Sequence, residues 1–279
     1  MLKVALPNKG ILSESAIQML KEAGYTVRRD TKDLHVVDSA HDIEFFYLRP
    51  RDIATYVGSG SLDVGFTGLD LLLDSRSAAR KVADLGFGSS TFRFAGPLGK
   101  FKSISDLSGL RVATAYPNLV TDFLQKNSVA AQIVSLDGAV EVAVQLGVAD
   151  AVADVVSTGN TLRQAGLETF GPVMLESSAQ LIVSPRITNE HDQLLRRMQG
   201  VLVAREYVIF DYDCPLSLVE KASSITPGIE SPTISPLREA DWVAVRALVK
   251  SEDINKKMDE LYELGARAIL VSAIHAARI

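Results

Sequence analysis

The chain has 279 residues, of which 47% are hydrophobic and 23% are charged, and this composition favours two or three domains with sizeable cores. The formal net charge of -5 gives no overall electrostatic reason to expect nucleic acid or an anionic membrane as a partner. The single cysteine, Cys214, excludes an intrachain disulfide framework and is typical of a reducing compartment. The first residues lack a basic segment followed by a long apolar run, and no apolar run is long enough to span a bilayer. We therefore expect a soluble, cytoplasmic protein.

Short apolar runs alternate with segments of helical period over roughly the first two thirds of the sequence. The first stretch predicts strands at 2–6, 43–48 and 62–66, with helices at 12–23, 53–57 and from Leu69. The second stretch predicts strands at 110–115, 131–134 and 151–156, with helices at 118–126 and 139–146. Another helix is expected near 191–205. Alternating strands and helices predict parallel sheets that are covered on both faces.

Two short segments, 60–65 and 147–152, resemble each other. Each follows a predicted helix, turns at a glycine and carries an aspartate, Asp63 or Asp150, before an apolar strand. Each strand then enters a polar loop that contains glycine. Because ligands bind beyond the carboxyl ends of parallel strands, two similar lobes that face each other would line a cleft with both loops. We therefore expect an α/β fold with two doubly wound lobes and a cleft, as in periplasmic binding proteins.

The second of these loops is the most informative segment. Asp154 lies near the end of the strand, and Ser157-Thr-Gly-Asn-Thr161 follows just before a predicted helix at Leu162. Backbone N–H groups and hydroxyls in such a loop converge on a phosphate, assisted by the positive end of the helix dipole. An acid one loop away suits ribose hydroxyls or a hydrated Mg²⁺. The segment therefore predicts a site for a phosphorylated sugar, and the alternative is an ordinary strand-to-helix turn with Ser/Thr caps.

The pattern changes in the last quarter of the chain. Strands are expected at 207–212, 233–235, 242–249 and 268–272, and helices at 216–224 and 254–264. The order β-α-β-β-α-β is the ferredoxin-like arrangement, and the Pro/Gly/Ser-rich segment 226–236 is a loop within it. Small modules of this kind act as sensors or as assembly units, and the fold alone does not decide between these roles.

Taken in order along the whole chain, these motifs resemble the long form of ATP phosphoribosyltransferase, the first enzyme of histidine biosynthesis. The resemblance rests on Leu6-Pro-Asn-Lys-Gly10, Phe46-Tyr-Leu-Arg-Pro-Arg-Asp-Ile53, Gly65-Phe-Thr-Gly-Leu-Asp70, Leu85-Gly-Phe-Gly-Ser-Ser-Thr-Phe92, Ala113-Thr-Ala-Tyr-Pro-Asn118, Asp137-Gly-Ala-Val-Glu141, the loop from Asp154 to Thr161, Thr226-Pro-Gly and Ser231-Pro-Thr-Ile-Ser-Pro236. It implies transfer of 5-phosphoribosyl from phosphoribosyl pyrophosphate (PRPP) to N1 of the ATP adenine. Pyrophosphate leaves, Mg²⁺ assists, and histidine inhibits through the C-terminal domain.

The resemblance also implies a domain plan. Residues 1–90 plus about 184–211 would form catalytic lobe I, because in the family the chain returns to the first lobe after completing the second. Residues 91–183 would form catalytic lobe II with the PRPP loop. Residues 212–279 would form a ferredoxin-like (ACT-like) regulatory domain. The active unit of the family is a dimer that builds into a hexamer, so a homo-oligomer is expected.

On the PRPP side, the reaction requires a fixed 5-phosphate and stabilisation of the charge that develops as the anomeric C–O bond breaks. By resemblance, PRPP would be bound by Asp154, Ser157, Thr158, Gly159, Asn160 and Thr161. Asp154 and Glu141 would be the catalytic carboxylates, with Asp154 on the ribose hydroxyls. Glu141 has the alternative of a solvated helix residue after an Asp137 cap. Mg²⁺ would come with the ligand phosphates rather than in a protein cage, and the four histidines lack metal-ligand spacing.

On the ATP side, the candidates are Lys9, Arg49 and Asp70, with Tyr116 as a secondary one. Lys9 can meet a phosphate as a point charge, and the Arg49 fork suits a bidentate contact. Asp70 has the alternative of a partner for a helix dipole. Tyr116 either stacks near the nucleotide or fills a wall. Arg51, in the same motif as Arg49, is more easily a surface charge.

A histidine effector needs an acceptor for its ammonium group, donors for its carboxylate and walls for its ring. By resemblance, the effector pocket would use Asp213, Ile229, Ser231, Thr233 and Ala268. The alternative is that the prolines of the 226–236 loop only make a rigid turn and that Asp213 is solvated.

Two other function classes stay open. A two-lobed solute receptor or sensing regulator has no need of the Ser157–Thr161 loop, and the sequence carries no helix-turn-helix signature. A phosphoribosyltransferase that acts on another base would share the loop but lack the paired lobes and the appended module.

Overall fold

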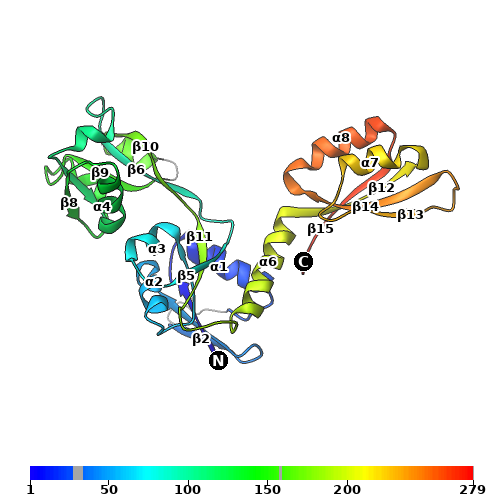
Figure 1. Ribbon diagram of the computed structural model, residues 1–279, viewed down its shortest axis with the longest axis horizontal. Coiled ribbons are helices and arrows are strands. Elements are labelled where there is room, and N and C mark those ends of the chain that lie inside the picture. Colours follow the sequence, from blue (N-terminus) through cyan, green and yellow to red (C-terminus); the bar gives the residue numbers. More distant parts are fainter. Residues whose placement is uncertain (28–33, 157–158, 279) are drawn as a thin grey trace. The chain divides into compact units, whose positions relative to one another are not determined.

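The structure, a computed structural model, describes residues 1–27, 34–156 and 159–278. It divides into two compact units: Met1–Lys21 with Tyr25–Asp192, and Glu22–Gly24 with Gln193–Ile279. The first unit contains two α/β sheets and the second an antiparallel sheet with helices (Figure 1). Among the described residues, no helix is both long and apolar enough to cross a membrane.

The first sheet has the strand order β2-β3-β1-β4-β11-β5. Its strands are β1 (Leu2–Pro7), β2 (His35–Asp38), β3 (Ile43–Leu48), β4 (Val64–Gly68), β5 (Arg80–Asp84) and β11 (Ala179–Val183), and its helices are α1 (Ile11–Glu22), α2 (Pro50–Gly58) and α3 (Leu69–Ser75). Strands β3, β1 and β4 are parallel. Helix α2 begins with Pro50 at its first turn, a position where the missing N–H costs nothing, and buries Ile53 and Val57 against Ala5 and Ile182 of the sheet.

The second sheet has the order β10-β6-β9-β7-β8. Its strands are β6 (Ser90–Pro97), β7 (Arg111–Thr114), β8 (Gln132–Ser135), β9 (Ala151–Val156) and β10 (Leu167–Ser177), and its helices are η1 (Ile104–Leu107), α4 (Pro117–Lys126), η2 (Val140–Ala143) and α5 (Asn160–Gln164). Phe92 and Phe94 pack with Val120 of α4 in one core. A second core joins Val152 of β9 to Leu162 of α5. The sheet is thus covered by apolar side chains on two faces.

The predicted parallel strands are present in both sheets, but the sheets are mixed. Strands β2, β5 and β11 in the first sheet and β6 and β10 in the second run antiparallel to their neighbours. Strand β11 is buried throughout and lies between β4 and β5 of the first sheet. The chain therefore returns to the first sheet at Ala179, earlier than the expected position near 184. The domain limits given above otherwise remain a prediction.

The helix predicted over 139–146 is only a short 3₁₀ turn, Val140–Ala143. Gly138 and Ala139 precede it with φ angles of 115° and 48°, so the chain enters the helical region late. Gly147, with φ 68°, turns the chain away soon afterwards. The segment therefore has room for little more than one turn.

The internal resemblance of segments 60–65 and 147–152 corresponds to matching backbone geometry. In the first lobe, the N–H of Asp63 donates to the Lys3 carbonyl at 2.9 Å, and the Asp63 carboxylate accepts the Lys3 N–H at 2.8 Å. In the second lobe, Asp150 makes the same pair of bonds to Arg111, at 2.9 Å and 3.0 Å. Each aspartate joins the start of one parallel strand to the next, so the two lobes are built on one repeated plan.

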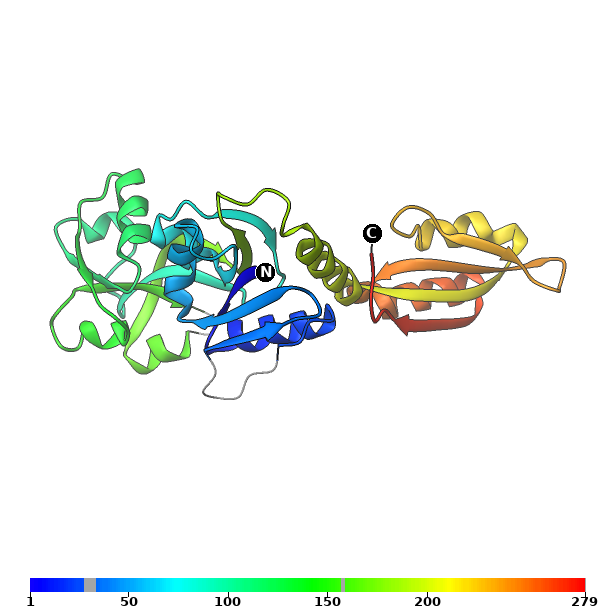
Figure 2. The same cartoon turned by 90° about the horizontal axis from the view of Figure 1, so that it is seen from below.

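The second unit confirms the predicted β-α-β-β-α-β order. Helix α6 (Asp192–Glu206) precedes a module of β12 (Tyr207–Pro215), η3 (Leu216–Leu218), α7 (Val219–Ile225), β13 (Thr233–Pro236), β14 (Trp242–Lys250), η4 (Ser251–Asp253), α8 (Ile254–Leu264) and β15 (Arg267–Ala273). The sheet order is β13-β14-β12-β15, antiparallel throughout. Phe210 and Cys214 of β12 are buried with Ala222 of α7 and Leu261 of α8. Figures 1 and 2 show both helices on one face of the sheet.

Candidate active site

Three of the predicted ATP-side residues follow neighbouring parallel strands of the first sheet. Strand β1 ends at Pro7 opposite Leu48 of β3, and the N–H of Asn8 donates to the Leu48 carbonyl at 2.8 Å. Lys9 directly follows Asn8, Arg49 directly follows Leu48, and both side chains are exposed. Asp70 lies in the first turn of α3, which follows β4 on the other side of β1. The sheet therefore brings all three side chains to one edge, where parallel sheets bind ligands.

Asp70 is a buried acid at this edge, only 6% exposed. Its carboxylate accepts a hydrogen bond from the Ser177 hydroxyl at 2.8 Å, and its N–H donates to the same hydroxyl at 3.1 Å. Ser177 is the last residue of β10 and pairs with Ser90 of β6. The start of α3 is thus fixed to a strand of the second sheet.

Tyr116 occupies the corresponding edge of the second sheet, two residues after the end of β7. Burial raises the pKa of its phenol far above the usual range, and the charge of Asp70 with a hydrogen bond to the Asp70 carboxylate raises it further. The ring lies edge-on to Phe92, with centroids 5.0 Å apart, and the Arg51 guanidinium carbon lies 5.0 Å from its centroid. The tyrosine is both a wall residue and a polar partner of a predicted site residue.

Asp154 and Glu141 are close enough to influence each other. Burial raises the pKa of Asp154 above its usual value. The charges of Glu141 and Asp70 raise it further, while Arg51 and the Val155 N–H lower it. The N–H of Val155 donates to the Asp154 carboxylate at 2.8 Å. A partly desolvated carboxylate among other carboxylates favours a positive ligand nearby.

The predicted phosphate loop is described only in part, since Ser157 and Thr158 lie outside the described residues. Gly159 has φ 70°, in the left-handed region that glycine adopts without strain, and α5 begins at the next residue. The Arg163 guanidinium donates to the Asn160 side-chain carbonyl, and Thr161 is exposed in the first turn. The strand, turn and helix follow the predicted order.

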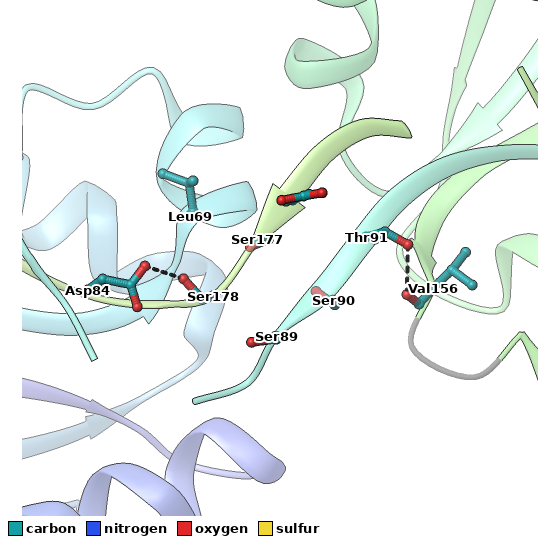
Figure 3. Close-up of a pocket in the computed structure, with 9 residues that line it drawn as sticks. Leu69, Asp84, Ser89, Ser90, Thr91, Val156, Ser177 and Ser178 are labelled. Atoms are coloured by element: carbon teal, nitrogen blue, oxygen red, sulfur yellow. Dashed lines mark hydrogen bonds between the residues drawn. The ribbon is translucent and has the colours of Figure 1, made fainter. Parts of the chain in front are cut away.

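A hollow of about 500 Å³ lies where the chain passes between the two sheets. Figure 3 shows Ser89 and Ser90 on one connecting strand and Ser177 and Ser178 on the other. Further lining residues are Leu69, Asp84, Thr91, Val156 and Glu176. The Ser178 hydroxyl donates to Asp84 at 2.6 Å, and the Thr91 hydroxyl donates to the Val156 carbonyl at 3.1 Å. Hydroxyls and carboxylates thus line the hollow, and Val156, the last residue of β9, lies at its edge.

Sequence reasoning missed several residues of this region. Arg51, expected as a surface charge, contacts both Tyr116 and Asp74, with Nη1 3.4 Å from the Asp74 carboxylate. Asp74 and Ser177 gave no local signal, because their partners are distant in the sequence. Across the described residues, no group of three or more His, Cys, Asp or Glu side chains could hold a metal ion.

The five predicted effector residues fall into two groups. Ile229, Ser231 and Thr233 line one hollow of about 430 Å³, together with Ile209, Glu230, Arg246, Ala247, Leu248 and Arg278. Asp213 lies in β12, opposite Arg267 of β15 and beside a register irregularity, and Ala268 follows in β15 with φ 51°. Strand β14 lies between β13 and β12. Three of the five residues, Ile229, Ser231 and Thr233, therefore line this hollow, and Asp213 and Ala268 lie on the strands beyond β14.

The fold and the site define a two-lobed α/β protein with polar loops at the ends of its parallel strands and an appended ferredoxin-like domain. The family model for ATP phosphoribosyltransferase matches residues 49–201, and the model for the C-terminal domain of HisG matches residues 204–276.

The chain is 59% identical to the ATP phosphoribosyltransferase of Pseudarthrobacter chlorophenolicus and 54% identical to that of Mycobacterium tuberculosis, with all of both chains covered in each case. Among solved structures, the ATP phosphoribosyl transferase (HisG:HisZ) complex from Thermotoga maritima is 30% identical with a TM-score of 0.64. That match covers 72% of this chain and 98% of the other. The chain therefore belongs to the ATP phosphoribosyltransferase family of histidine biosynthesis, in the long form with the C-terminal domain.

Proposed function

We propose that the first unit transfers 5-phosphoribosyl from PRPP to N1 of the ATP adenine, with PRPP on the second lobe and ATP on the first. The observation that carries this division is the meeting of Asp70 from the first lobe with Tyr116 from the second, with Asp154 close enough to affect the phenol. Residues that follow the parallel strands of both lobes are thus close together, as a reaction between two separately bound substrates requires.

On the PRPP side, the loop of 157–161 binds the 5-phosphate. The left-handed Gly159 and the start of α5 support this role, because free N–H groups at a helix start favour an anion. Asp154, on the strand that enters the loop, contacts the ribose hydroxyls. Asn160 and Thr161 supply polar groups at the first turn of the helix. The phosphate and the ribose are then held by one strand-loop-helix segment.

Asp154 and Glu141 also stabilise the transition state. As the anomeric C–O bond breaks, positive charge develops on the ribose, and carboxylates that repel one another in the free protein gain from that charge. The raised pKa of Asp154 supports this assignment, because burial and the neighbouring Glu141 disfavour its ionised form until a cation arrives.

Mg²⁺ suits this site when it arrives with the phosphates of PRPP. The carboxylates of Asp154 and Glu141 are hard oxygen donors of the kind this ion prefers, and the small number of protein donors leaves positions for phosphate and water. When bound, the ion screens the negative charge that builds on the leaving pyrophosphate. Asp154 and Glu141 orient the ribose beside it.

On the ATP side, Lys9 and Arg49 supply positive charge to the triphosphate from neighbouring strand ends. Asp70 and Tyr116 form the wall against which the nucleotide is oriented, and Arg51 lies over the tyrosine ring. Attack by adenine N1 needs alignment behind the anomeric carbon rather than an acid or base on the ring. We therefore assign these residues to positioning.

The second unit is a regulatory domain that binds histidine. The hollow lined by Ile229, Ser231 and Thr233 supports a site for a small polar ligand, since Arg246 can meet a carboxylate and Glu230 an ammonium group. We further propose that the protein forms a homo-oligomer, as a dimer that builds into a hexamer, and that it works in the cytoplasm.

The function is tested with radiolabelled PRPP, Mg²⁺ and a panel of acceptors that contains ATP and other nucleobases or nucleotides. We expect label transfer to ATP with release of pyrophosphate and little transfer to the other acceptors. Transfer to another base without product from ATP would show that the chain belongs to a phosphoribosyltransferase of different specificity. Binding of the panel without any transfer would support a receptor.

A further inference from the structure

Helix α4 begins with a residue that is poorly suited to begin a helix. The first N–H groups of a helix have no partner within it, and a Ser, Thr, Asp or Asn at the N-cap usually accepts them. Here the N-cap is Tyr116, with φ -126° and ψ 66°, and its side chain makes no capping hydrogen bond among the described residues. Pro117 follows and removes one donor, but the next N–H groups still need acceptors.

The missing acceptor comes from the other lobe. Oδ1 of Asp74, in α3, accepts the N–H of Asn118 at 2.9 Å and that of Leu119 at 3.1 Å. The Asn118 side-chain amide in turn donates to the Asp74 carbonyl at 2.8 Å. Asp74 is only 7% exposed, so these bonds form largely out of solvent. A first-lobe carboxylate therefore caps a second-lobe helix.

The same carboxylate also acts on the ring of the N-cap residue. The second oxygen, Oδ2, accepts from Nη1 of Arg51 at 3.4 Å, and the Arg51 guanidinium carbon lies 5.0 Å from the Tyr116 ring centroid. Through one oxygen, Asp74 thus holds the backbone of the first turn of α4, which follows Tyr116, and through the other it holds the cation over the Tyr116 ring. These two interactions hold Tyr116 from two sides. Its phenol forms a hydrogen bond with Asp70, which lies one helical turn before Asp74 in α3.

We propose that Asp74 is a positioning residue of the active site, a helix cap supplied across the lobes that leaves the N-cap position free for Tyr116. An N-cap Ser or Asp would complete the helix but could not place a phenol between the lobes. A tyrosine at that position needs a cap from elsewhere, and Asp74 supplies it. The catalytic consequence rests on the proposed function, because it requires that Tyr116 and Asp70 face ATP.

The chain offers a matched control on the same two segments. Arg76, the C-cap of α3, pairs with Asp122 of α4, and the side chains of both are about half exposed. Asp122→Ala removes a carboxylate that joins the same helices without touching the start of α4. An exposed ion pair of this kind contributes little, so the control should retain wild-type kinetics.

The kinetic test compares Asp74→Ala, Asp74→Asn and Asp122→Ala in the full chain. We expect Asp74→Ala to lower kcat/KM for ATP about tenfold or more, because two hydrogen bonds to a charged acceptor are lost, and to leave KM for PRPP nearly unchanged. Asp74→Asn should restore most of the loss, since an asparagine oxygen caps as well as an aspartate. In a Tyr116→Ala background, Asp74→Ala should have little further effect. An equal loss in both backgrounds, or a loss no larger than that of Asp122→Ala, would overturn the proposal.

A second readout does not depend on activity. Amide hydrogen exchange at Asn118 and Leu119 should be faster in Asp74→Ala than in wild type, but unchanged in Asp122→Ala. If this exchange pattern is found but ATP is not a substrate, Asp74 still caps α4, and only the proposed function is wrong. Unchanged exchange would overturn the cap itself. Should Asp74→Ala not fold, Asp74→Ser, whose side chain is too short to span the two helices, replaces it in both measurements.

Discussion

The hydroxyl of Ser177 donates to the carboxylate of Asp70 at 2.8 Å, although the two residues are 107 positions apart in the sequence. Ser177 ends β10, directly before the chain returns to the first sheet, and Asp70 stands in the first turn of α3. The bond therefore joins a strand of the second sheet to a residue that we assign to ATP. Substrate binding beside Asp70 and the connection between the lobes are physically adjacent.

Replacing Asp154 by asparagine should lower activity and raise stability at neutral pH. Because burial raises the folded pKa of this carboxyl, its contribution to stability is present below its unfolded pKa and is lost as the pH rises through the folded pKa. Asp154→Asn removes the buried charge. Denaturant unfolding at pH 7 should therefore show a more stable variant, with the difference vanishing toward pH 3, while kcat falls on the order of 10²-fold. A variant that is less stable at pH 7 would contradict the assignment.

Asp84 should show the opposite pH dependence. Burial raises the pKa of its carboxyl, but hydrogen bonds from Ser178, Gly86 and Gln180 outweigh burial and lower it. Its contribution to stability is then present above its unfolded pKa and lost as the pH falls through the lower folded value. Asp84→Asn should lower the free energy of unfolding by about 1 kcal/mol at pH 7 and by less in acid. The loss is near the lower end for hydrogen bonds to a charged group because the Asp84 side chain is exposed. Asp137→Asn, a substitution at another exposed aspartate, is the control. If Asp84→Asn lost the same stability at pH 7 and in acid, the predicted pH dependence would be wrong.

The sequence predicts most of the elements that carry the site because their signals are local. Apolar runs identify the buried parallel strands, and the Ser157–Thr161 spacing predicts a phosphate loop. Strands β2, β5, β6, β10 and β11, which all pair antiparallel, are not among the predicted elements. Of these, the edge strands β2 and β5 are short and partly exposed and lack a long apolar run. Ser177 and Asp74 were not predicted either, because each acts on a partner that only the tertiary fold brings close.

Histidine regulation should respond to residues of the hollow in the second unit. Thr233→Ala should weaken histidine binding about tenfold, since it removes one hydroxyl from a charged ligand, while leaving turnover without histidine unchanged. Asp213→Ala should do the same if the site extends beyond β14. Calorimetry and inhibition assays measure both effects, with Ser272→Ala as an exposed control on β15. Wild-type histidine sensitivity in both variants would remove the effector assignment.

Assembly can be measured on the protein without ligands. We expect sedimentation velocity to show a dimer or a larger species at micromolar concentration, and histidine to alter the distribution if the second unit couples binding to assembly. A strictly monomeric protein with full activity would contradict the proposed homo-oligomer.

The division of the cleft between the two substrates is tested most directly by crossing two variants with two substrates in initial-rate kinetics. Thr161→Ala removes a hydroxyl from the phosphate loop and should raise KM for PRPP roughly tenfold to hundredfold, while KM for ATP stays nearly unchanged. Asp70→Asn keeps the shape of the ATP-side acid but not its charge and should show the reverse pattern. Equal weakening of both substrates by both variants would contradict the division.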